Sequence, residues 1–397
     1  MLEILFISSL AFVLALLITW WLHRQHELDI VVEPASLPPD QPAPYISVIV
    51  PARDEARNIR RCLEALLAQD YPSYEIIVVD DRSTDETSDI LREIQAGLVD
   101  QAASGDHPQP SLQVIEGIDL PAGWTGKPHA LQQGVQVARG EWLCFIDADT
   151  FAGTQLLAST YLTARQHGAH MFTILTRQEL VTFWERTILP LVFTALGVGF
   201  PSRRVNDPSK PDAIANGQFI LIQRDAYQAI GGHAAVKERI DEDRALAQAV
   251  KGAGYRLLLA NGWQVATTRM YTNFSEIWEG WTKNIFLGMR DQLALLSFGA
   301  LVGLLGSLAL PAWLLLLGWS WLLGGGGLVA CVVAAQALLA WLALLSSRAQ
   351  ACRAFEIPRT YAFTLPLGAF MLTAMMFAST FKVLSGRGVS WRGRTYK

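Results

Sequence analysis

Hydrophobic and polar positions divide the 397-residue chain into three zones. Residues 2–22 form an apolar run about long enough to cross a bilayer, and residues 293–345 and 361–384 are further apolar stretches. Between them, over residues 45–261, short apolar runs alternate with segments of helical period. The pattern predicts a folded domain flanked by membrane segments.

The middle zone is expected to alternate strands with helices. We expect strands at 46–50, 75–80, 112–115, 142–146 and 214–222, and helices at 58–69, 84–95, from Lys127 and from Ile240; one further helix, at 272–289, is expected beyond this zone. The strands are continuous apolar runs, so they should be buried on both faces. This order indicates an α/β domain with a mainly parallel sheet covered on both sides.

Polar residues follow the predicted strands where each one ends. The first strand delivers Arg53, Asp54 and Glu55, the second Asp80 and Asp81, and the fourth Asp147 and Asp149. In parallel sheets, ligands bind beyond the carboxyl ends of the strands. Asp-x-Asp suits a hard divalent cation, which also holds phosphate oxygens. A solvated turn is the alternative for this tripeptide taken alone.

Two later stretches add further candidate groups. Gly123 to Lys127 opens a helix with glycines and a lysine, which suits a phosphate, although Lys127 could equally be a surface lysine. Asp241, Glu242 and Asp243 open another helix, where acids also serve as stabilising end groups. A phosphate site, a metal and a separate carboxylate base are the components needed to transfer a group from a nucleotide diphosphate.

The overall composition agrees with apolar segments at the two ends of the chain. The hydrophobic share of 51% and the charged share of 17% are too apolar for an ordinary soluble enzyme. The net charge of −4 gives no reason to expect nucleic acid as a partner. The four cysteines have no metal-binding spacing, and a reducing cytosolic setting fits them.

The apolar ends predict the membrane arrangement. Residues 1–24 are expected to be an uncleaved transmembrane anchor, because Trp20 and Trp21 end the run and Arg24 follows it. Arg24 favours a cytoplasmic domain in a multi-pass protein of the plasma membrane. Residues 25–44 are a proline-rich linker, and 180–200 should be an interfacial helix because charges and Pro190 interrupt it.

The C-terminal topology stays open. Residues 293–345 can hold two spans joined at Gly324 to Gly327, residues 361–384 are a third apolar segment, and residues 385–397 are a basic tail. Three spans after one anchor would place this tail outside, against the positive-inside tendency. Either one segment is re-entrant or interfacial, or the tail is an exception.

Successive motifs of the middle zone resemble glycosyltransferase family 2. They are Ser47 to Glu55, Val79 to Asp85, Gly126 to Leu131, Asp147-Ala148-Asp149 and Glu242 to Ala247, within a likeness that spans residues 45–284. The resemblance implies an inverting enzyme of GT-A fold, with a catalytic domain at 45–292. Trp278 to Asn284 and Gly386 to Arg394 look most like the membrane-bound ceramide-glucosyltransferase-like and hopanoid- or carotenoid-associated branches.

The resemblance also implies roles for individual residues. Asp243, with Glu242, would be the catalytic base, and Asp149, assisted by Asp147, would hold Mg²⁺ or Mn²⁺. Trp278, Trp281 and Lys283 would lie on the acceptor or membrane side. The residues implied in nucleotide-sugar binding are Pro51, Arg53, Asp54, Glu55, Asp80, Asp81, Lys127, Asp147, Asn216, Gly217 and Gln218.

One departure from the family pattern separates the competing functions. Processive members carry Gln-x-x-Arg-Trp after the base, whereas Trp281-Thr282-Lys283-Asn284 stands in that region here. This favours a single transfer from a nucleotide-diphosphate sugar, with uridine as the expected nucleotide, to a hydroxyl or carboxyl of a lipid acceptor. The alternatives are a polysaccharide synthase and a non-catalytic, nucleotide-binding accessory protein.

Overall fold

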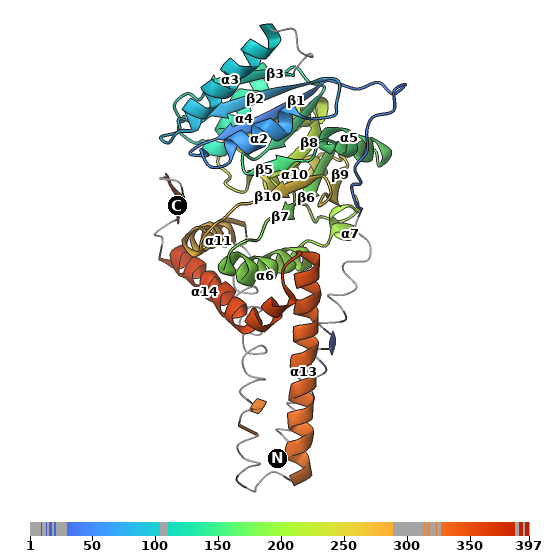
Figure 1. Cartoon of the computed structure of the whole chain (residues 1–397), viewed down its shortest axis with the longest axis vertical. Coiled ribbons are helices and arrows are strands. Elements are labelled where there is room, and N and C mark those ends of the chain that lie inside the picture. Colours follow the sequence, from blue (N-terminus) through green and yellow to red (C-terminus); the bar gives the residue numbers. More distant parts are fainter. Residues whose placement is uncertain are drawn as a thin grey trace. The chain divides into compact units, whose positions relative to one another are not determined.

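The computed structural model describes residues 9, 13, 16, 17, 20, 30–103, 110–288, 313, 314, 316, 317, 323, 327–385, 389–391 and 394–396. They belong to two compact units, each built from separate stretches of chain (Figure 1). Residues 29–179 and 200–270 form one, here called the sheet unit. Residues 1–28, 180–199 and 271–397 form the other, called the helical unit after its described elements.

A seven-stranded sheet organises the sheet unit, in the order β3-β2-β1-β4-β8-β6-β9. Its strands are β1 (Ile46–Ala52), β2 (Tyr74–Asp80), β3 (Ser111–Glu116), β4 (Trp142–Ile146), β6 (Met171–Leu175), β8 (Phe219–Gln223) and β9 (Leu257–Asn261). β1, β2, β3 and β4 pair in parallel, as do β6 and β9, whereas β8 runs antiparallel to β4 and β6. The predicted mainly parallel sheet is confirmed.

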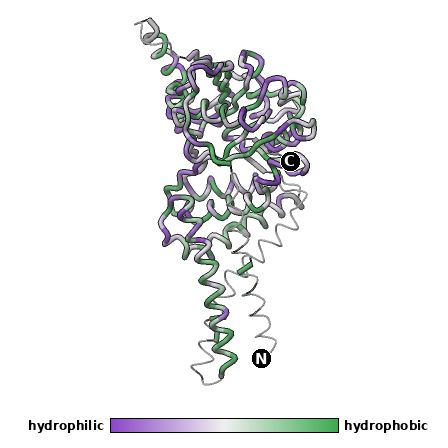
Figure 2. Tube along the Cα trace, turned by 90° about the vertical axis from the view of Figure 1, so that its right-hand side faces the viewer, coloured by the Kyte–Doolittle hydropathy of each residue, from purple (hydrophilic) through white to green (hydrophobic). Residues whose placement is uncertain are grey.

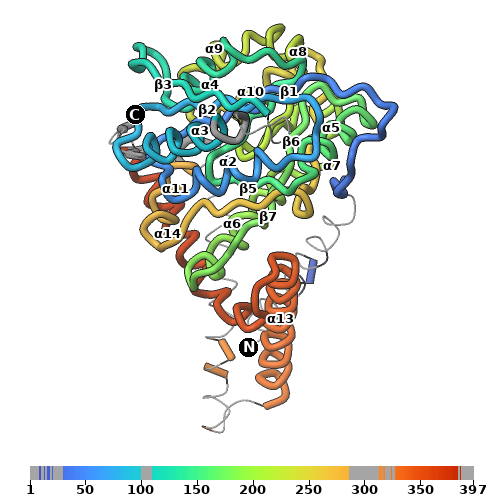
Figure 3. Tube along the Cα trace, turned by 45° about the horizontal axis from the view of Figure 1, so that its top comes forward, coloured from blue at the N-terminus to red at the C-terminus, as the bar shows by residue number. Residues whose placement is uncertain are grey.

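Helices cover both faces of this sheet (Figure 3). Successive side chains of a strand point to opposite faces, so Val48 packs in one core and Ile49 in the other. The first core receives α2 (Ile59–Leu67), α3 (Thr87–Ala103) and α5 (Leu156–Gln166). The second receives α4 (Gly126–Val137), α8 (Arg224–Ala229) and α10 (Glu242–Gly252), and α9 (Gly232–Ala235) lies beside α4. Burial on both faces explains the continuous apolar strands.

A buried carboxylate fixes the amino-terminal side of β2. Glu75 is 2% exposed and accepts hydrogen bonds from Ser47 Oγ at 2.7 Å and from the backbone N–H of Arg139 at 2.7 Å. The Arg139 guanidinium also donates to it, through Nη2 at 2.8 Å. Burial alone would raise the pKa of Glu75, but these donors outweigh it and lower the pKa. The charge is therefore part of the fold.

A second, three-stranded sheet, absent from the sequence-based expectations, has the order β5-β10-β7. β5 (Thr150–Ala152) begins directly after Asp149, and it pairs with β10 (Ala266–Thr268), which pairs in turn with β7 (Arg177–Gln178). These strands are two or three residues long, too short for a recognisable hydrophobic period. They fix the chain immediately beyond the Asp-x-Asp segment.

The helical unit contains α6 (Phe183–Gly199), α11 (Phe274–Gly288), α13 (Gly327–Ala354), the 3₁₀ helix η3 (Arg359–Thr364) and α14 (Leu365–Leu384). Within the part of the chain that the structure describes, three helices are long and apolar enough to span a membrane, judged by length and composition: Phe183–Val205, Gly327–Ala354 and Arg359–Lys382. Their mean hydropathies are 1.2, 2.5 and 1.6, so α13 has the strongest signal, and Figure 2 shows it as predominantly hydrophobic. The low value for 183–205 leaves the interfacial assignment of this helix a prediction.

Several expectations fall on residues outside the described part. The N-terminal anchor at 2–22 is one, and the first of the two spans expected within 293–345 is another. The second of those expected spans falls on α13, which is a candidate membrane helix. In the basic tail, β11 (Val389–Trp391) pairs with β12 (Arg394–Tyr396), a hairpin that the sequence did not predict.

Candidate active site

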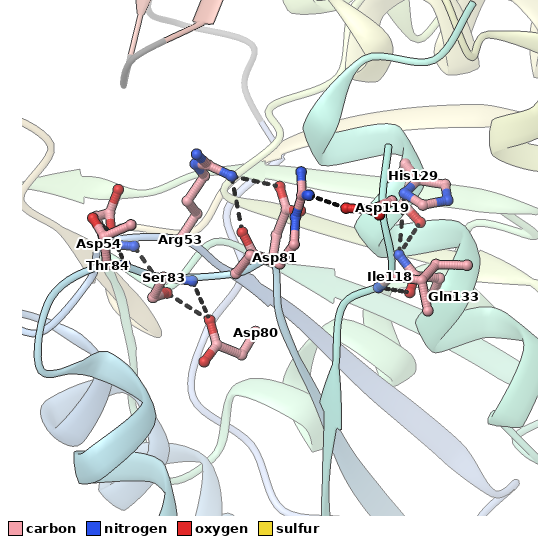
Figure 4. A network of polar contacts seen from close by, with 11 residues as sticks. Arg53, Asp54, Asp80, Asp81, Ser83, Thr84, Ile118, Asp119, His129 and Gln133 are labelled. Carbon is pink, nitrogen blue, oxygen red and sulfur yellow. Dashed lines mark hydrogen bonds and ion pairs between the residues drawn. The ribbon is translucent and has the colours of Figure 1, made fainter. Parts of the chain in front are cut away.

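The parallel strands β1, β2 and β4 end at one edge of the sheet, because Ala52 lies opposite Asp80 and Ile49 opposite Phe145. The segments after β1 and β2 are tied together by polar contacts (Figure 4). Arg53 Nη1 donates to the carbonyl of Asp81 at 3.0 Å and lies 3.8 Å from the Asp81 carboxylate. Asp54 Oδ1 accepts from the backbone N–H of Thr84 at 2.7 Å. The residues predicted to bind the nucleotide sugar after β1 and β2 therefore lie on one surface.

Asp80 has a local task in this network. Its Oδ1 accepts from the backbone and hydroxyl of Ser83, at 3.0 and 2.5 Å, and its Oδ2 accepts from Ser88. Glu55 Oε2 accepts from Asn58 Nδ2 at 3.1 Å. Both carboxylates are buried and order the loops around them. Pro51 lies within β1 and is half-buried.

A second group of charges surrounds Lys127, the second residue of α4. Lys127 Nζ lies 2.6 Å from Asp147 Oδ1 and 3.0 Å from Glu242 Oε1, with 33% of its side chain exposed. Burial would lower the pKa of Lys127, but the carboxylates of Asp147, Glu242 and Asp243 outweigh it and raise the pKa. The lysine therefore stays charged and joins the end of β4 to the start of α10.

The three acids at the start of α10 have separate contacts. Asp241, at the N-cap position, makes no side-chain cap bond and pairs with Arg239 at 2.7 Å. Glu242 contacts Lys127, whereas Asp243 Oδ2 accepts from the backbone N–H of Gly217 at 3.0 Å. Helix capping therefore does not explain this run of acids.

Asp243 is the strongly perturbed acid of this group. Burial and the neighbouring Glu242 raise its pKa to about 7, against the lowering effects of Lys127 and of the N–H groups of Arg244 and Gly217. A carboxylate with a pKa near the operating pH is suited to accept a proton and release it again. The geometry thus places a proton acceptor beside a fixed cation.

The two neighbours of Gly217, Asn216 and Gln218, belong to a buried polar network. Gln218, 5% exposed, accepts at Oε1 from Thr176, from Gln178 Nε2 at 3.2 Å and from Asn216 Nδ2 at 3.1 Å. Asn216 Nδ2 also donates to the carbonyl of Ile174 at 2.9 Å. These bonds replace the start of the predicted strand 214–222, so β8 begins only at Phe219.

Residues 47–231 match the family model of glycosyl transferase family 2. They form a family 2 glycosyltransferase domain. The chain is 28% identical over 274 residues to 4,4'-diaponeurosporenoate glycosyltransferase of Staphylococcus aureus strain USA300, which covers 66% of this chain and 68% of that protein. The fold of the present chain is similar to that of a mannosyltransferase from Pyrobaculum calidifontis solved with GDP-Man and Mn²⁺. The TM-score is 0.54 at 18% identity, over 97% of this chain and 99% of the other.

The family 2 domain offers oxygen ligands for a metal at the end of β4. Among the described residues, no three His, Cys, Asp or Glu side chains are placed to hold a metal ion together. Asp147 and Asp149 nevertheless supply two carboxylates, and Mg²⁺ or Mn²⁺ bound to so few protein groups completes its shell with phosphate and water oxygens. The donor set therefore fits a metal that arrives with a diphosphate.

The predicted acceptor-side residues lie on α11, in the helical unit. Trp281 is buried and packs edge-on against Phe193 of α6, with ring centroids 5.9 Å apart. Trp278 packs against Phe274 of its own helix, also at 5.9 Å, and Lys283 is half-buried on the same helix. Trp281 therefore packs α11 against α6, whereas the role of Trp278, Trp281 and Lys283 towards the acceptor stays a prediction.

The sequence did not reveal the residues that support Gly217 and Gln218. Thr150, Thr176, Gln178 and Thr268 are buried and form a hydrogen-bonded chain across the small sheet. Single threonines and a glutamine in apolar surroundings give no distinctive motif. Only Thr150 lies close behind a predicted strand, 142–146; no strand was predicted directly before Thr176, Gln178 or Thr268.

Proposed function

We propose that the chain is a membrane-anchored, inverting glycosyltransferase that transfers a sugar from a nucleotide-diphosphate donor to a lipid acceptor. The observation that carries the proposal is the contact of Lys127 with both Asp147 and Glu242, beside the raised-pKa carboxylate of Asp243. An acid expected to lie near the sugar donor (Asp147), a cation (Lys127) and a proton acceptor (Asp243) therefore belong to one group of charged residues.

In the proposed reaction an acceptor oxygen attacks the anomeric carbon of the sugar. A carbon–oxygen bond forms, the bond to the diphosphate breaks, and Asp243 takes the proton of an acceptor hydroxyl. Lys127 offsets negative charge as it grows on the leaving diphosphate. Attack from the face opposite the diphosphate inverts the anomeric configuration.

The acceptor is proposed to be a lipid with a hydroxyl or carboxyl group. The relative's name denotes a carboxylate, 4,4'-diaponeurosporenoate. A carboxylate has no proton to lose at neutral pH, whereas a hydroxyl requires a base. The raised pKa of Asp243 supports a hydroxyl acceptor, which this residue would deprotonate.

A divalent ion and a membrane complete the proposal. Mg²⁺ or Mn²⁺, held by Asp149 and Asp147, would neutralise charge on the diphosphate. Arg53, Asp54 and Asp81 would contact the nucleotide, with uridine as the expected base. The candidate membrane helices support association with a membrane. A multi-pass arrangement in the plasma membrane, with the sheet unit on the cytoplasmic side, is part of the proposal and rests on Arg24 following the first apolar run.

The test compares Asp243→Asn with Asp225→Asn, an exposed aspartate on α8. We expect Asp243→Asn to bind donor with wild-type affinity by calorimetry and to lose glycosyl transfer to a hydroxyl acceptor by at least about a hundredfold. Asp225→Asn should retain both properties. Wild-type turnover in Asp243→Asn would show that the base assignment is wrong.

A further inference from the structure

Helix α6 of the helical unit contains a proline, Pro190. Proline has no backbone N–H, so the carbonyl four residues earlier, that of Arg186, loses its helical donor. A replacement must come from elsewhere if this carbonyl is to be satisfied away from water.

The replacement comes from α13. Arg348 Nη2 donates to the carbonyl of Arg186 at 2.8 Å and to that of Thr187 at 3.1 Å. Helix α14 also approaches closely here, because a side-chain carbon added to Gly368 would lie 2.6 Å from the Thr187 carbonyl. Three helices therefore meet around one guanidinium, which is 3% exposed.

This arrangement supplies hydrogen-bond acceptors to one nitrogen only and no negative charge. Arg348 Nε and Nη1 are buried without a hydrogen-bond partner, and no described carboxylate lies within ion-pair distance of the guanidinium. A buried charge without a counter-ion is costly, and polar groups inside membrane segments commonly mark functional sites.

A neighbouring hydroxyl is also unsatisfied. Among the described residues, the buried Thr187 Oγ1 has no hydrogen-bond partner. Thr194, Thr373 and Thr380 of the same unit each donate to the carbonyl four residues earlier, which is the usual solution for a helical threonine. Thr187, whose carbonyl Arg348 contacts, therefore carries a buried hydroxyl that is not used for a hydrogen bond among the described residues, as do Thr282 and Ser379 elsewhere in this unit.

We propose that Arg348, together with Thr187, binds the oxyanion of a membrane lipid, a carboxylate or a phosphate. The planar guanidinium presents paired N–H donors that match such oxygens, and the bound anion would supply the missing charge. A lipid is favoured because α13 is strongly apolar and exposes Leu338, Leu339 and Leu342. The protein covers both free nitrogens, so the anion must displace the side chains over them. This site lies within the helical unit and is independent of the proposed glycosyl transfer.

The experiment uses the full-length protein in nanodiscs of phosphatidylcholine, doped with either oleate or phosphatidylglycerol. Binding of each lipid is measured by native mass spectrometry, with inorganic phosphate as a soluble competitor. The variants are Arg348→Gln and, as a matched control, Arg353→Gln, which removes an exposed arginine from the same helix.

We expect wild type to prefer at least one anionic lipid over phosphatidylcholine and Arg348→Gln to bind it about ten- to hundredfold more weakly. Arg353→Gln should match wild type. Preference for oleate alone identifies a carboxylate site, and preference for phosphatidylglycerol alone identifies a phosphate site. The proposal is overturned if wild type shows no preference for an anionic lipid, or if inorganic phosphate binds as tightly as the lipid.

Gel filtration and thermal unfolding show whether Arg348→Gln folds. If it does not fold, Arg348→Lys is used to test the proposal. This variant keeps the charge and loses the paired donors, so we expect affinity to fall about tenfold. Thr187→Val should weaken binding less, because it removes a single donor. Wild-type affinity in Arg348→Lys would overturn the assignment of the guanidinium.

Discussion

The substitution Gly217→Ala tests the coupling between Lys127 and Asp243. A side-chain carbon at residue 217 would lie 2.8 Å from Lys127 Nζ and 3.1 Å from Asp243 Oδ2. The ammonium is the end of a flexible chain and is expected to swing away, while the carboxylate needs to shift by only a few tenths of an ångström. Lys127 would then lose its contacts of 2.6 Å to Asp147 and 3.0 Å to Glu242.

The expected effect is large on turnover and small on stability. A third of the Lys127 side chain is exposed, so its ion pairs contribute at most about 1 kcal/mol to folding. Charge-assisted hydrogen bonds in a reacting complex contribute about 1.5–3 kcal/mol, which corresponds to about a ten- to hundredfold loss of kcat. Because Lys127 lowers the pKa of Asp243, its displacement should also move the pH midpoint of the reaction above about 7.

The assay is release of nucleoside diphosphate at saturating donor over a range of pH, alongside thermal unfolding. Gly252→Ala is the matched control, since Gly252 ends α10 and a side-chain carbon there meets nothing within 4 Å. We expect the control to keep wild-type kcat and pH midpoint. Unchanged kcat and midpoint in Gly217→Ala would refute the coupling.

Three further predictions concern Asp243, Asp149 and Glu75. In wild type, kcat/KM should fall as pH drops through about 7, because protonated Asp243 accepts no proton. The negative charge of Glu242 raises the pKa of Asp243, so the pH midpoint of the reaction should move to lower pH in Glu242→Gln. Asp149→Ala should weaken Mn²⁺-dependent donor binding at least about tenfold by calorimetry, and unchanged affinity would exclude Asp149 as a ligand. Glu75→Gln should destabilise the fold by about 1–3 kcal/mol in denaturant unfolding at pH 7. The folded-state pKa of Glu75 is lowered, so the wild-type advantage should shrink as falling pH protonates this carboxylate; a pH-independent difference would contradict the role of its charge.

Continuous apolar runs made the central fold predictable. Strands β1, β2 and β4 are buried on both faces, and each contains an unbroken apolar run: Val48 to Val50, Ile76 to Val79 and Trp142 to Ile146. Their parallel order brings Asp81 and Asp147 to one edge of the sheet, as expected. The reversed direction of β8 was not predictable, because a buried run looks the same in either direction.

Local sequence also failed to show which acids the fold itself uses. Asp80 and Asp81 are adjacent and chemically identical, yet Asp80 is bound by Ser83 and Ser88 while Asp81 faces Arg53. The contact of Lys127 with Glu242 joins residues 115 positions apart (242 − 127). Such pairings depend on tertiary packing, which no spacing rule captures.

The most direct test of the account is a donor panel with the detergent-solubilised protein. Release of nucleoside diphosphate is scored with Mg²⁺ or Mn²⁺, with and without a membrane lipid extract. The account predicts release from one nucleotide sugar that depends on the lipid extract and yields a glycosylated lipid. Release without lipid, together with a growing carbohydrate product, would indicate a polysaccharide synthase. Metal-dependent nucleotide binding with no release from any donor would contradict the enzymatic account altogether.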